Sequence, residues 1–260
     1  MIQFCKNLFI YRELLRELVV SNIKARYKQS VLGVGWALLQ PLALMVIAMV
    51  VFFQFAKVPS DGLPYPLFVY TALLPWTLHA TALSSGITSL VSNVSLIRKI
   101  YFPRELFIVS AIMISLIDYL IASIVFIGML IFYRITPGVW ILSFPLLLFI
   151  HLLLITGIAL GGAIINTAFR DVSKALPLVL QIWMLASPVM YPLSLVTEKY
   201  HVIYLLNPMV GIIDSYRKVI LHNTAPDARS LLFSAGTSLI LFAVGYRLFK
   251  AGEAMTADIV

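Results

Sequence analysis

The chain has 260 residues, of which 61% are apolar and only 12% are charged. A soluble domain carries about 25% charged residues, and the mean hydropathy here is +0.99. These values exclude a disordered chain, a collagen and an ordinary soluble domain, and they indicate a protein that crosses a membrane several times. The net charge of +8 does not indicate nucleic-acid binding, because the basic residues lie between apolar runs and form no separate basic stripe.

The first 31 residues form an amphipathic stretch. Its apolar residues recur at steps of four and three: Phe4, Leu8, Tyr11, Leu15 and Leu18. On a helix these residues fall within about an 80° arc, and charged residues occupy the other side. The pattern predicts an amphipathic helix over 1–31 that lies in the interface plane on the cytoplasmic side. A helix packed on a cytosolic partner is the alternative, and both hold if a partner contacts its polar face.

Six apolar runs follow, and a helix needs about 20 residues to cross the hydrocarbon core. The runs lie at about 32–56, 66–91, 106–133, 140–165, 175–191 and 231–249. The fifth run is short and is interrupted by Pro177, Pro188 and Pro192. The sequence therefore predicts one all-α integral membrane domain with six transmembrane helices over residues 32–250, followed by a cytoplasmic tail at 251–260.

Basic residues set the orientation of such a domain, because cytoplasmic segments carry an excess of Lys and Arg. With the N-terminus inside, thirteen of the 19 basic residues lie in inside segments and six lie outside. Both termini are therefore predicted to be cytoplasmic. The long outside segment 194–228 contains a stretch, Asn207 to Leu221, that is amphipathic enough for a short helix dipping into the outer leaflet. A solvated loop with one surface helix is the alternative.

Motifs for chemistry are absent from the sequence. It contains no G-x-x-x-x-G-K-[ST], no H-E-x-x-H and no G-x-S-x-G. The single Cys5 and the four scattered histidines have no ligand spacing. We therefore expect no catalytic residue, no metal site and no bound cofactor in this chain.

Three ionisable residues, His79, Asp118 and His151, are expected near the middle of three different spans and at similar depth. Such groups are costly in a membrane unless they are paired or hydrated. They form either a proton relay or a hydrogen-bond cluster that ties the spans together. We favour the cluster, because a relay usually uses more than one carboxylate.

Small and aromatic residues within the spans also need an account. Gly157 and Gly161 form a G-x-x-x-G pattern that lets helices approach closely, and we expect it to serve packing within the subunit. Trp76 and Trp183 fall near mid-span, where interfacial belts do not explain them. They either fill the bundle core or, together with the outer aromatics of the first span, form a conduit wall on which sugars stack.

Four groups of short stretches follow one another along the chain. They are Leu32-Gly33-Val34-Gly35-Trp36 with Gln40-Pro41, Phe169-Arg170-Asp171, Leu180-Gln181 with Ser187-Pro188-Val189 and Tyr191-Pro192, and Asn207-Pro208 with Arg217. In order, spacing and topology they resemble the membrane (permease) subunits of type-2 ABC exporters, in the branch that exports O-antigen, capsule and teichoic-acid polysaccharides. The resemblance covers nearly the whole chain.

The resemblance implies a six-span permease of the bacterial cytoplasmic (inner) membrane. It implies a homodimer that works with two separate P-loop ATPase subunits, which bind the ATP and Mg, on a lipid-linked polysaccharide substrate. It also implies re-entrant helices before the last span and a conduit lined by the first and fifth spans of two copies. The residues expected to line the conduit are Phe52, Phe53, Trp76, Trp183 and Tyr191.

The resemblance further implies two coupling elements, one from Asn93 to Arg104 and one formed by the N-terminal helix and the turn after the fourth span. The residues expected to contact the ATPase are Leu96, Arg98, Lys99, Tyr101, Arg104, Phe169, Arg170 and Asp171. Basic residues of the first element would pair with acidic partner residues; the alternative is that they only obey the positive-inside rule. We expect Arg170 and Asp171 to form a local ion pair that fixes the turn.

The main hypothesis is a channel-forming subunit that exports lipid-linked polysaccharide and itself makes and breaks no bond. An exporter of small lipophilic compounds on the same scaffold is one alternative. An intramembrane lipid-linked sugar transferase is another, but it would need clustered carboxylates and often a metal near one membrane face. The spans contain Asp118 as their single acidic residue.

Overall fold

A computed structural model describes residues 2–28, 32–33, 35–99 and 102–253, and every element in these ranges is helical. In chain order the elements are α1 (Ile2–Ile10), α2 (Arg12–Tyr27), α3 (Gly35–Ala48), η1 (Met49–Phe55), α4 (Tyr65–Ser92), α5 (Val94–Ile97), α6 (Glu105–Phe132), η2 (Val139–Ser143), α7 (Phe144–Ala168), α8 (Asp171–Leu185), η3 (Leu193–Leu195), α9 (Glu198–Leu205), α10 (Pro208–Arg217), η4 (Lys218–His222) and α11 (Ala228–Glu253). The predicted all-α class is confirmed for the described residues.

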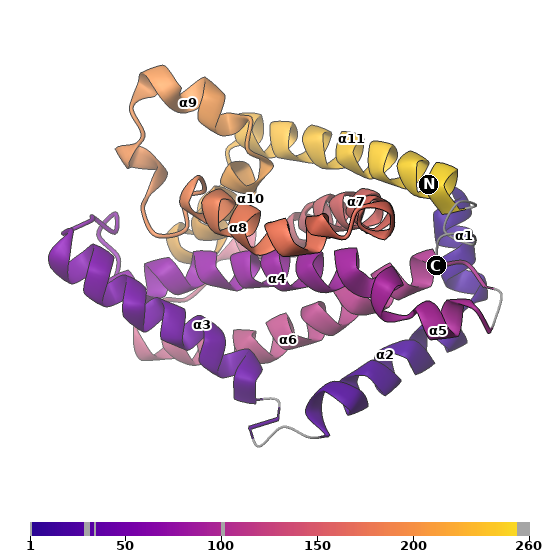
Figure 1. Cartoon of the computed structure of the whole chain (residues 1–260). Helices are drawn as coiled ribbons and strands as arrows, with labels where there is room; N and C mark the ends of the chain where they lie inside the picture. The colour runs from indigo at the N-terminus through magenta and orange to yellow at the C-terminus, as the bar shows by residue number, and fades with distance from the viewer. Residues whose placement is uncertain (1, 29–31, 34, 100–101, 254–260) are drawn as a thin grey trace.

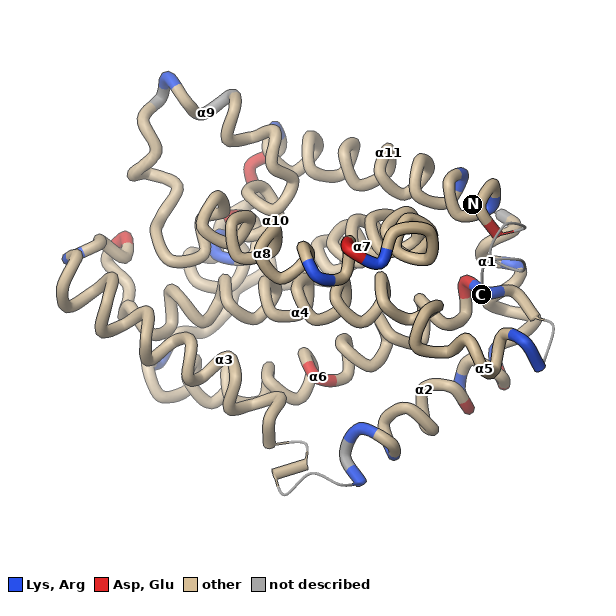
Figure 2. The backbone as a smooth tube through the Cα atoms, in the orientation of Figure 1, with Lys and Arg blue, Asp and Glu red and all other residues tan. Residues whose placement is uncertain are grey.

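The long helices run back and forth across the molecule (Figure 1). The short helices α1 and α5 and the last turns of α11 lie at one end, and the loop before α4 and helix α9 lie at the other. Lys and Arg concentrate on α1, α2, the turn just after α5 and the end of α11, whereas the long helices carry few charges (Figure 2). This separation of charge from apolar length is typical of a chain that crosses a membrane repeatedly.

Helices occupy all six apolar runs. Four of them are long and apolar enough to cross a membrane, at 35–55, 105–132, 139–168 and 228–253. The 28 residues of α4 include no Asp, Glu, Lys or Arg, but they include His79 and many Ser and Thr. The 15-residue α8 ends at Leu185, before the expected end near 191. A residue that precedes proline disfavours the helical conformation, so the helix stops ahead of Pro188.

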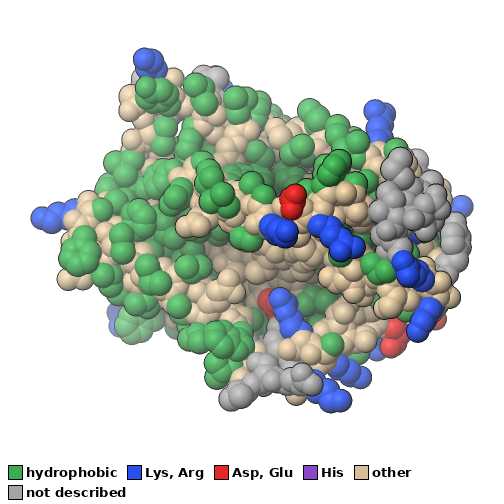
Figure 3. Space-filling view, in the orientation of Figure 1, with side chains coloured by type: hydrophobic (Ala, Val, Ile, Leu, Met, Phe, Trp, Pro, Cys, Tyr) green, Lys and Arg blue, Asp and Glu red, His purple; other side chains and the backbone are tan. Residues whose placement is uncertain are grey.

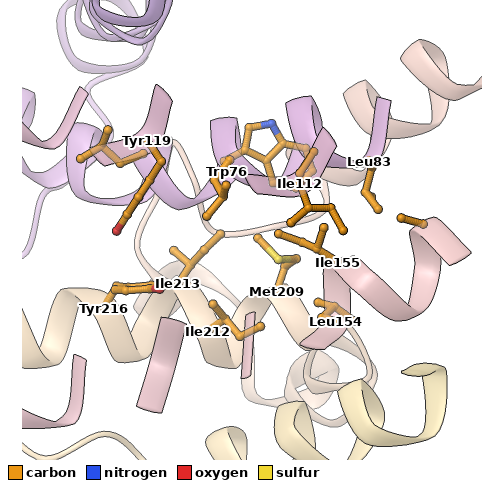
Figure 4. Packing of buried hydrophobic residues seen from close by; sticks show 14 of the residues in the cluster. Trp76, Leu83, Ile112, Tyr119, Leu154, Ile155, Met209, Ile212, Ile213 and Tyr216 are labelled. Carbon is orange, nitrogen blue, oxygen red and sulfur yellow. The ribbon is translucent and has the colours of Figure 1, made fainter. Parts of the chain in front are cut away.

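Helix α4 lies at the centre of the bundle. It packs against α3, α6, α7, α8 and α10 and is buried along most of its length. Figure 4 shows where α4, α6, α7 and α10 meet, with Trp76 of α4, Tyr119 of α6, Ile155 of α7 and Ile213 of α10 gathered in one cluster. Lipid tails are as apolar as leucine, so close packing rather than exclusion of water holds such helices together in a membrane.

Helices α7 and α11 touch backbone to backbone. A methyl group added to Gly157 would lie 2.5 Å from the backbone nitrogen of Phe242, and one added to Gly245 would collide with the carbonyl oxygen of Gly157. A methyl group on Gly161 would meet Gly245 at 3.4 Å. The G-x-x-x-G pattern therefore serves packing within the chain, as expected.

The N-terminal stretch forms two helices rather than the single helix that we expected. The backbone turns at Tyr11 (φ −99°, ψ 25°), between α1 and α2. Phe4 packs edge-on against Phe242 of α11, with ring centroids 5.4 Å apart. Leu15 and Leu18 are buried, and α2 packs along α6. The apolar face thus covers the bundle itself, while Tyr11 sits at the break and is exposed.

The segment before the last span is folded into the bundle. Helix α10 packs against α4, α7 and α11, and Met209, Ile212 and Ile213 have no exposed surface. Pro208 occupies the first turn of the helix, where its missing N–H costs nothing. The alternative of a solvated surface helix is therefore wrong for this segment.

Candidate functional site

Asn207 joins the C-terminal end of α8 to the start of α10. Its Oδ1 accepts hydrogen bonds from Trp183 Nε1 at 2.8 Å and from the backbone N–H of Met209 at 3.0 Å. Its Nδ2 donates to the carbonyl of Ala186 at 3.0 Å and to the hydroxyl of Ser187 at 2.9 Å. An amide side chain has two donors and two acceptor lone pairs, so every polar site of Asn207 is used.

Arg217 is the second polar anchor at this end, and its side chain is almost completely buried. Its Nη2 donates to the carbonyl of Val189 at 2.8 Å and its Nη1 to the carbonyl of Tyr191 at 3.3 Å. The guanidinium carbon lies 3.7 Å from the ring centroid of Phe68. A buried charge is costly unless it is hydrogen-bonded, and a ring face adds attraction. Arg217 therefore holds the segment after α8 against α4.

We refer to Trp183, Ser187, Asn207 and Arg217 as the outer polar cluster. Ser187, Asn207 and Arg217 come from motifs that the sequence presents separately, and Trp183 is one of the aromatic residues expected to line the conduit. Their shared physical role is to fix the chain where α8 ends and α10 begins.

Tyr191 links this region to α9. Its hydroxyl lies 2.7 Å from that of Tyr204 and donates to the carbonyl of Leu185 at 2.9 Å. Burial and, after it, the hydrogen bond with Tyr191 raise the pKa of Tyr204 above its ordinary value of 10.0. Because Tyr191 donates its single hydroxyl hydrogen to Leu185, Tyr204 is the donor in the pair.

The five aromatic residues expected to line a conduit lie in two environments. Trp76 is only 4% exposed and packs edge-on against Trp183 in the interior, with ring centroids 6.3 Å apart. Trp76 therefore lies in the interior of the single chain. The other four residues are partly or fully accessible: Phe52, Phe53, Trp183 and Tyr191.

The structure brings together two of the three ionisable residues expected at mid-span. His79 Nδ1 and His151 Nε2 are 3.3 Å apart, and both rings are fully buried. Trp183 packs edge-on against His79 at 4.7 Å. Asp118 instead forms an ion pair with Arg26 of α2, at 2.8 Å. The histidines thus tie α4 to α7. Asp118 instead ties α6 to α2, because its partner Arg26 comes from the N-terminal stretch and not from another span.

The segment after α4 carries the first set of expected coupling residues. Asn93 ends α4, and α5 is a single turn in which Leu96 packs against the core. Arg98 and Lys99 follow and are exposed. Tyr101 lies outside the described residues. The segment therefore presents two basic side chains on an anchored turn.

Arg104, which we expected to contact the ATPase, bonds within the chain. Its Nη1 donates to the carbonyl of Glu253 at 2.6 Å. The neighbouring Glu105 is completely buried and accepts from Asn7 at 2.7 Å and from Lys250 at 2.9 Å. The network joins α1, α6 and α11. The sequence analysis missed Glu105, although an acid at the first position of an apolar run was a usable signal.

The turn between α7 and α8 carries the second set. Phe169 is 69% exposed, and Arg170 and Asp171 are also exposed. Asp171 forms its ion pair with Lys174, at 3.5 Å, and not with Arg170 as we expected. Residues three apart on a helix share a face, whereas adjacent residues point apart.

Asn166 fixes this turn and was also missed by the sequence analysis. Its Nδ2 donates to the carbonyl of Ile87 on α4 at 3.3 Å, and its Oδ1 accepts from the backbone N–H of Ser173 on α8 at 3.1 Å. One buried side chain thus joins the ends of α4, α7 and α8. An amide at the end of an apolar run, directly before a turn, was the available signal.

Comparison with known proteins places these features in a family context. The ABC-2 type transporter family model matches residues 13–221. The chain is 29% identical over 254 residues to the O-antigen export system permease protein RfbA of Myxococcus xanthus, covering 96% of each protein. It is 28% identical to RfbA of Klebsiella pneumoniae, covering 98% of the chain and 97% of the relative. It is 24% identical to the polysialic acid transport protein KpsM of Escherichia coli, covering 91% and 92%.

Proposed function

The chain belongs to the ABC-2 type transporter family, and on this premise we propose that it is the channel-forming permease of an exporter for lipid-linked, O-antigen-like polysaccharide. The observation that carries the proposal is the end-to-end similarity to RfbA proteins, which extends over 96% of both chains in one case. The similarity to KpsM, a second polysaccharide transport protein, points to the same class of substrate.

We propose six membrane spans with both ends in the cytoplasm of a bacterial inner membrane. The four long apolar helices, the uncharged α4 and the shorter α8 supply the spans. Helix α1 and the end of α11 lie together with the basic α5 turn, which supports a common cytoplasmic side (Figure 2). Helices α10 and η4 then enter from the outer side without crossing.

Two copies of the chain and two ATPase subunits complete the proposed transporter. The sequence has no P-loop motif, so ATP and Mg would be held by the partner subunits. In each copy, α3 and α8 would face the shared conduit, with Phe52, Phe53 and Trp183 offering ring faces to sugar. This chain would supply the path and the mechanical connection, while the partner supplies the chemical energy.

The mechanical connection runs through α8. Its cytoplasmic start is held by Asn166 next to the exposed Phe169–Asp171 turn. Its outer end is held by Asn207 through Trp183 and Ser187. Movement of the turn by the ATPase would therefore be delivered, through one continuous helix, to the outer polar cluster and α10.

Deletion of this chain in its native cell tests the proposal. We expect polymer to accumulate in the cytoplasm, and export to return when the chain is restored from a plasmid. We also expect a P-loop ATPase to co-purify with the tagged chain. Undiminished surface polymer after deletion, or the lack of any co-purifying ATPase, would contradict the proposal.

A further inference from the structure

Two neighbouring cavities lie along α4 and α6, the first bordered by α3 and the second by α2, and we treat them together as one groove. The first, of about 220 Å³, extends from Trp36 to Asp118, and the second, of about 260 Å³, extends to Asn93 at the end of α4. Arg26 lines both. Figure 3 shows a hollow on this face of the molecule, with one acidic and one basic side chain meeting at its edge.

One wall of the groove is a row of hydroxyl groups on α4. The row consists of Thr77, Thr81, Ser85, Thr88 and Ser92. Steps of three and four residues place these side chains on a single face of the helix. Ser115 of α6 faces the row, with its hydroxyl oxygen 3.5 Å from that of Ser85. We call these cavities and their walls the hydroxyl groove.

Four of the five hydroxyl groups in this row, all except that of Thr77, already donate their hydrogens within α4. Thr81 donates to the carbonyl of Thr77 at 2.8 Å, and Ser85 donates to that of Thr81 at 2.7 Å. Thr88 and Ser92 likewise donate to carbonyls four residues earlier, at 2.8 and 3.0 Å. A hydroxyl has one donor and two acceptor lone pairs. The wall therefore offers acceptors, and it fits a ligand that is rich in hydrogen-bond donors.

The mouth of the groove adds a carboxylate and an aromatic ring. Asp118 and Arg26 form the ion pair at 2.8 Å, and the Trp36 side chain is 55% exposed. Sugar hydroxyls can donate to the carboxylate and to the α4 row, while their C–H faces stack on the ring. A phosphate has only acceptor oxygens, and along the α4 row and at Asp118 it would meet lone pairs and a carboxylate. Its donors would be the lining amides of Gln40, Asn22 and Asn93 and the Arg26 cation, which is already paired with Asp118. The chemistry favours sugar over an anionic headgroup.

From this geometry we infer that the hydroxyl groove binds sugar residues of the polysaccharide on the cytoplasmic side of the conduit. The inference rests on the proposed function and assigns a site to its substrate within a single subunit. The groove opens on the face that carries α3 and α8, so bound sugar would be next to the helices proposed to line the conduit (Figures 1 and 3).

The test measures protection of a cysteine placed in the groove. Cys5, the single cysteine of the chain, is first replaced by Ser. Thr88→Cys then reports on the groove, and Lys57→Cys, exposed in the loop before α4, is the control. Both are labelled with a water-soluble maleimide in the solubilised complex of the full chain and its ATPase. The probes are oligosaccharides cut from the cell's own surface glycan and, separately, inorganic pyrophosphate.

We expect the oligosaccharides to slow labelling of Thr88→Cys at least ~5-fold and to leave Lys57→Cys unaffected, since a few net hydrogen bonds suffice for such an effect. Pyrophosphate should protect neither position. Protection by pyrophosphate alone would overturn the inference in favour of an anionic headgroup site. Equal labelling with and without the oligosaccharides would overturn it outright.

A second variant checks that the hydroxyl oxygens are responsible. In the Thr88→Cys background, Thr81→Val with Ser85→Ala should weaken protection about tenfold, because two acceptors are lost. Thr156→Val is the matched control, since Thr156 also donates to a carbonyl four residues earlier, at 2.7 Å, but lies on α7 outside the groove. Equal loss of protection in both variants would contradict a specific role for the row. If polysaccharide export depends on the chain but the oligosaccharides do not protect Thr88→Cys, the groove is rejected as the sugar site while the proposed function stands.

Discussion

The two ends of α8 are held in different ways. At the C-terminal end, Asn207 uses all four of its hydrogen-bonding positions, and the buried Arg217 holds two carbonyls of the following segment. At the N-terminal end, Asn166 holds the backbone next to a turn whose Phe169 side chain is 69% exposed. A helix of 15 residues is about 22 Å long, so α8 alone connects the exposed Phe169–Asp171 turn with the buried polar contacts of Asn207.

This difference predicts that one end of α8 mainly determines the stability of the subunit and the other mainly its coupling to the ATPase. Buried polar groups are costly when they lose a partner, so changes in the outer polar cluster should unfold the subunit. Exposed charges contribute little to stability, so changes at the cytoplasmic turns should leave the fold intact and alter only communication with the ATPase. The variants below test that separation, beginning with the largest expected effect.

Arg217→Met should have the largest effect on stability. It leaves the carbonyls of Val189 and Tyr191 without donors, and each unpaired buried acceptor costs about 1–3 kcal/mol. We expect the free energy of unfolding to fall by about 2–4 kcal/mol, seen as a lower Tm of the purified complex. Lys218→Met is the control, because Lys218 is partly exposed and pairs with Asp214 at 2.8 Å. Equal Tm values for the two variants would show that the anchor is not at Arg217.

Asn207→Ala should come next, with a loss of about 2–3 kcal/mol, since it frees Trp183 Nε1 and two carbonyl or hydroxyl acceptors at the end of α8. Asn207→Asp can still accept the hydrogen bonds from Trp183 and Met209 but loses both donors. Its stability should therefore lie between those of the unchanged chain and of Asn207→Ala. Gln181→Ala, exposed on the same helix, is the matched control. Thermal unfolding monitored by tryptophan fluorescence gives the order, and an Asp variant as unstable as the Ala variant would contradict it.

Arg98→Glu combined with Lys99→Glu should separate coupling from folding. Both side chains are exposed on the α5 turn, so stability should change by less than about 0.5 kcal/mol. We expect export to fall about tenfold, a change of about 1.4 kcal/mol, while the partner continues to hydrolyse ATP. Lys199→Glu, exposed in α9 at the opposite end, should export normally. Normal export by the double variant would reject the placement of the coupling surface.

Asn166→Ala should give the smallest effect, an approximately threefold drop in export with a stability loss of about 1 kcal/mol, because one side chain with two hydrogen bonds is removed. Lys174→Ala breaks only the exposed pair with Asp171 and is the control. The measurement is export per ATP hydrolysed. An unchanged ratio in Asn166→Ala would show that the turn is positioned by other contacts.

Much of the fold could be predicted from the sequence because long apolar runs leave few alternatives to helix in a membrane. Helices fill all six expected runs, and the Gly157–Gly161 pattern correctly indicates close packing. The boundaries of α8 and the break at Tyr11 were harder to predict. Both depend on local backbone geometry that periodicity alone does not encode.

The candidate site was only partly predictable, because its polar contacts join distant segments. Arg26 and Asp118 are 92 positions apart, and Lys250 and Glu105 are 145 apart. A single sequence contains no signal for such pairs. The motifs in the sequence included Asn207 and Arg217. Their hydrogen-bond partners could be identified only from the way α8 and α10 pack in the structure.

The contact between Gly157 and Gly245 has a practical consequence for observing this transporter at work. Two helices whose backbones touch can neither slide nor rotate past each other without separating, so α7 and α11 form a fixed frame within the subunit. Spectroscopic labels on these helices would therefore serve as reference points. Distances from them to labels on α3 or α8 would report the motion of the conduit directly, without a correction for movement of the reference itself.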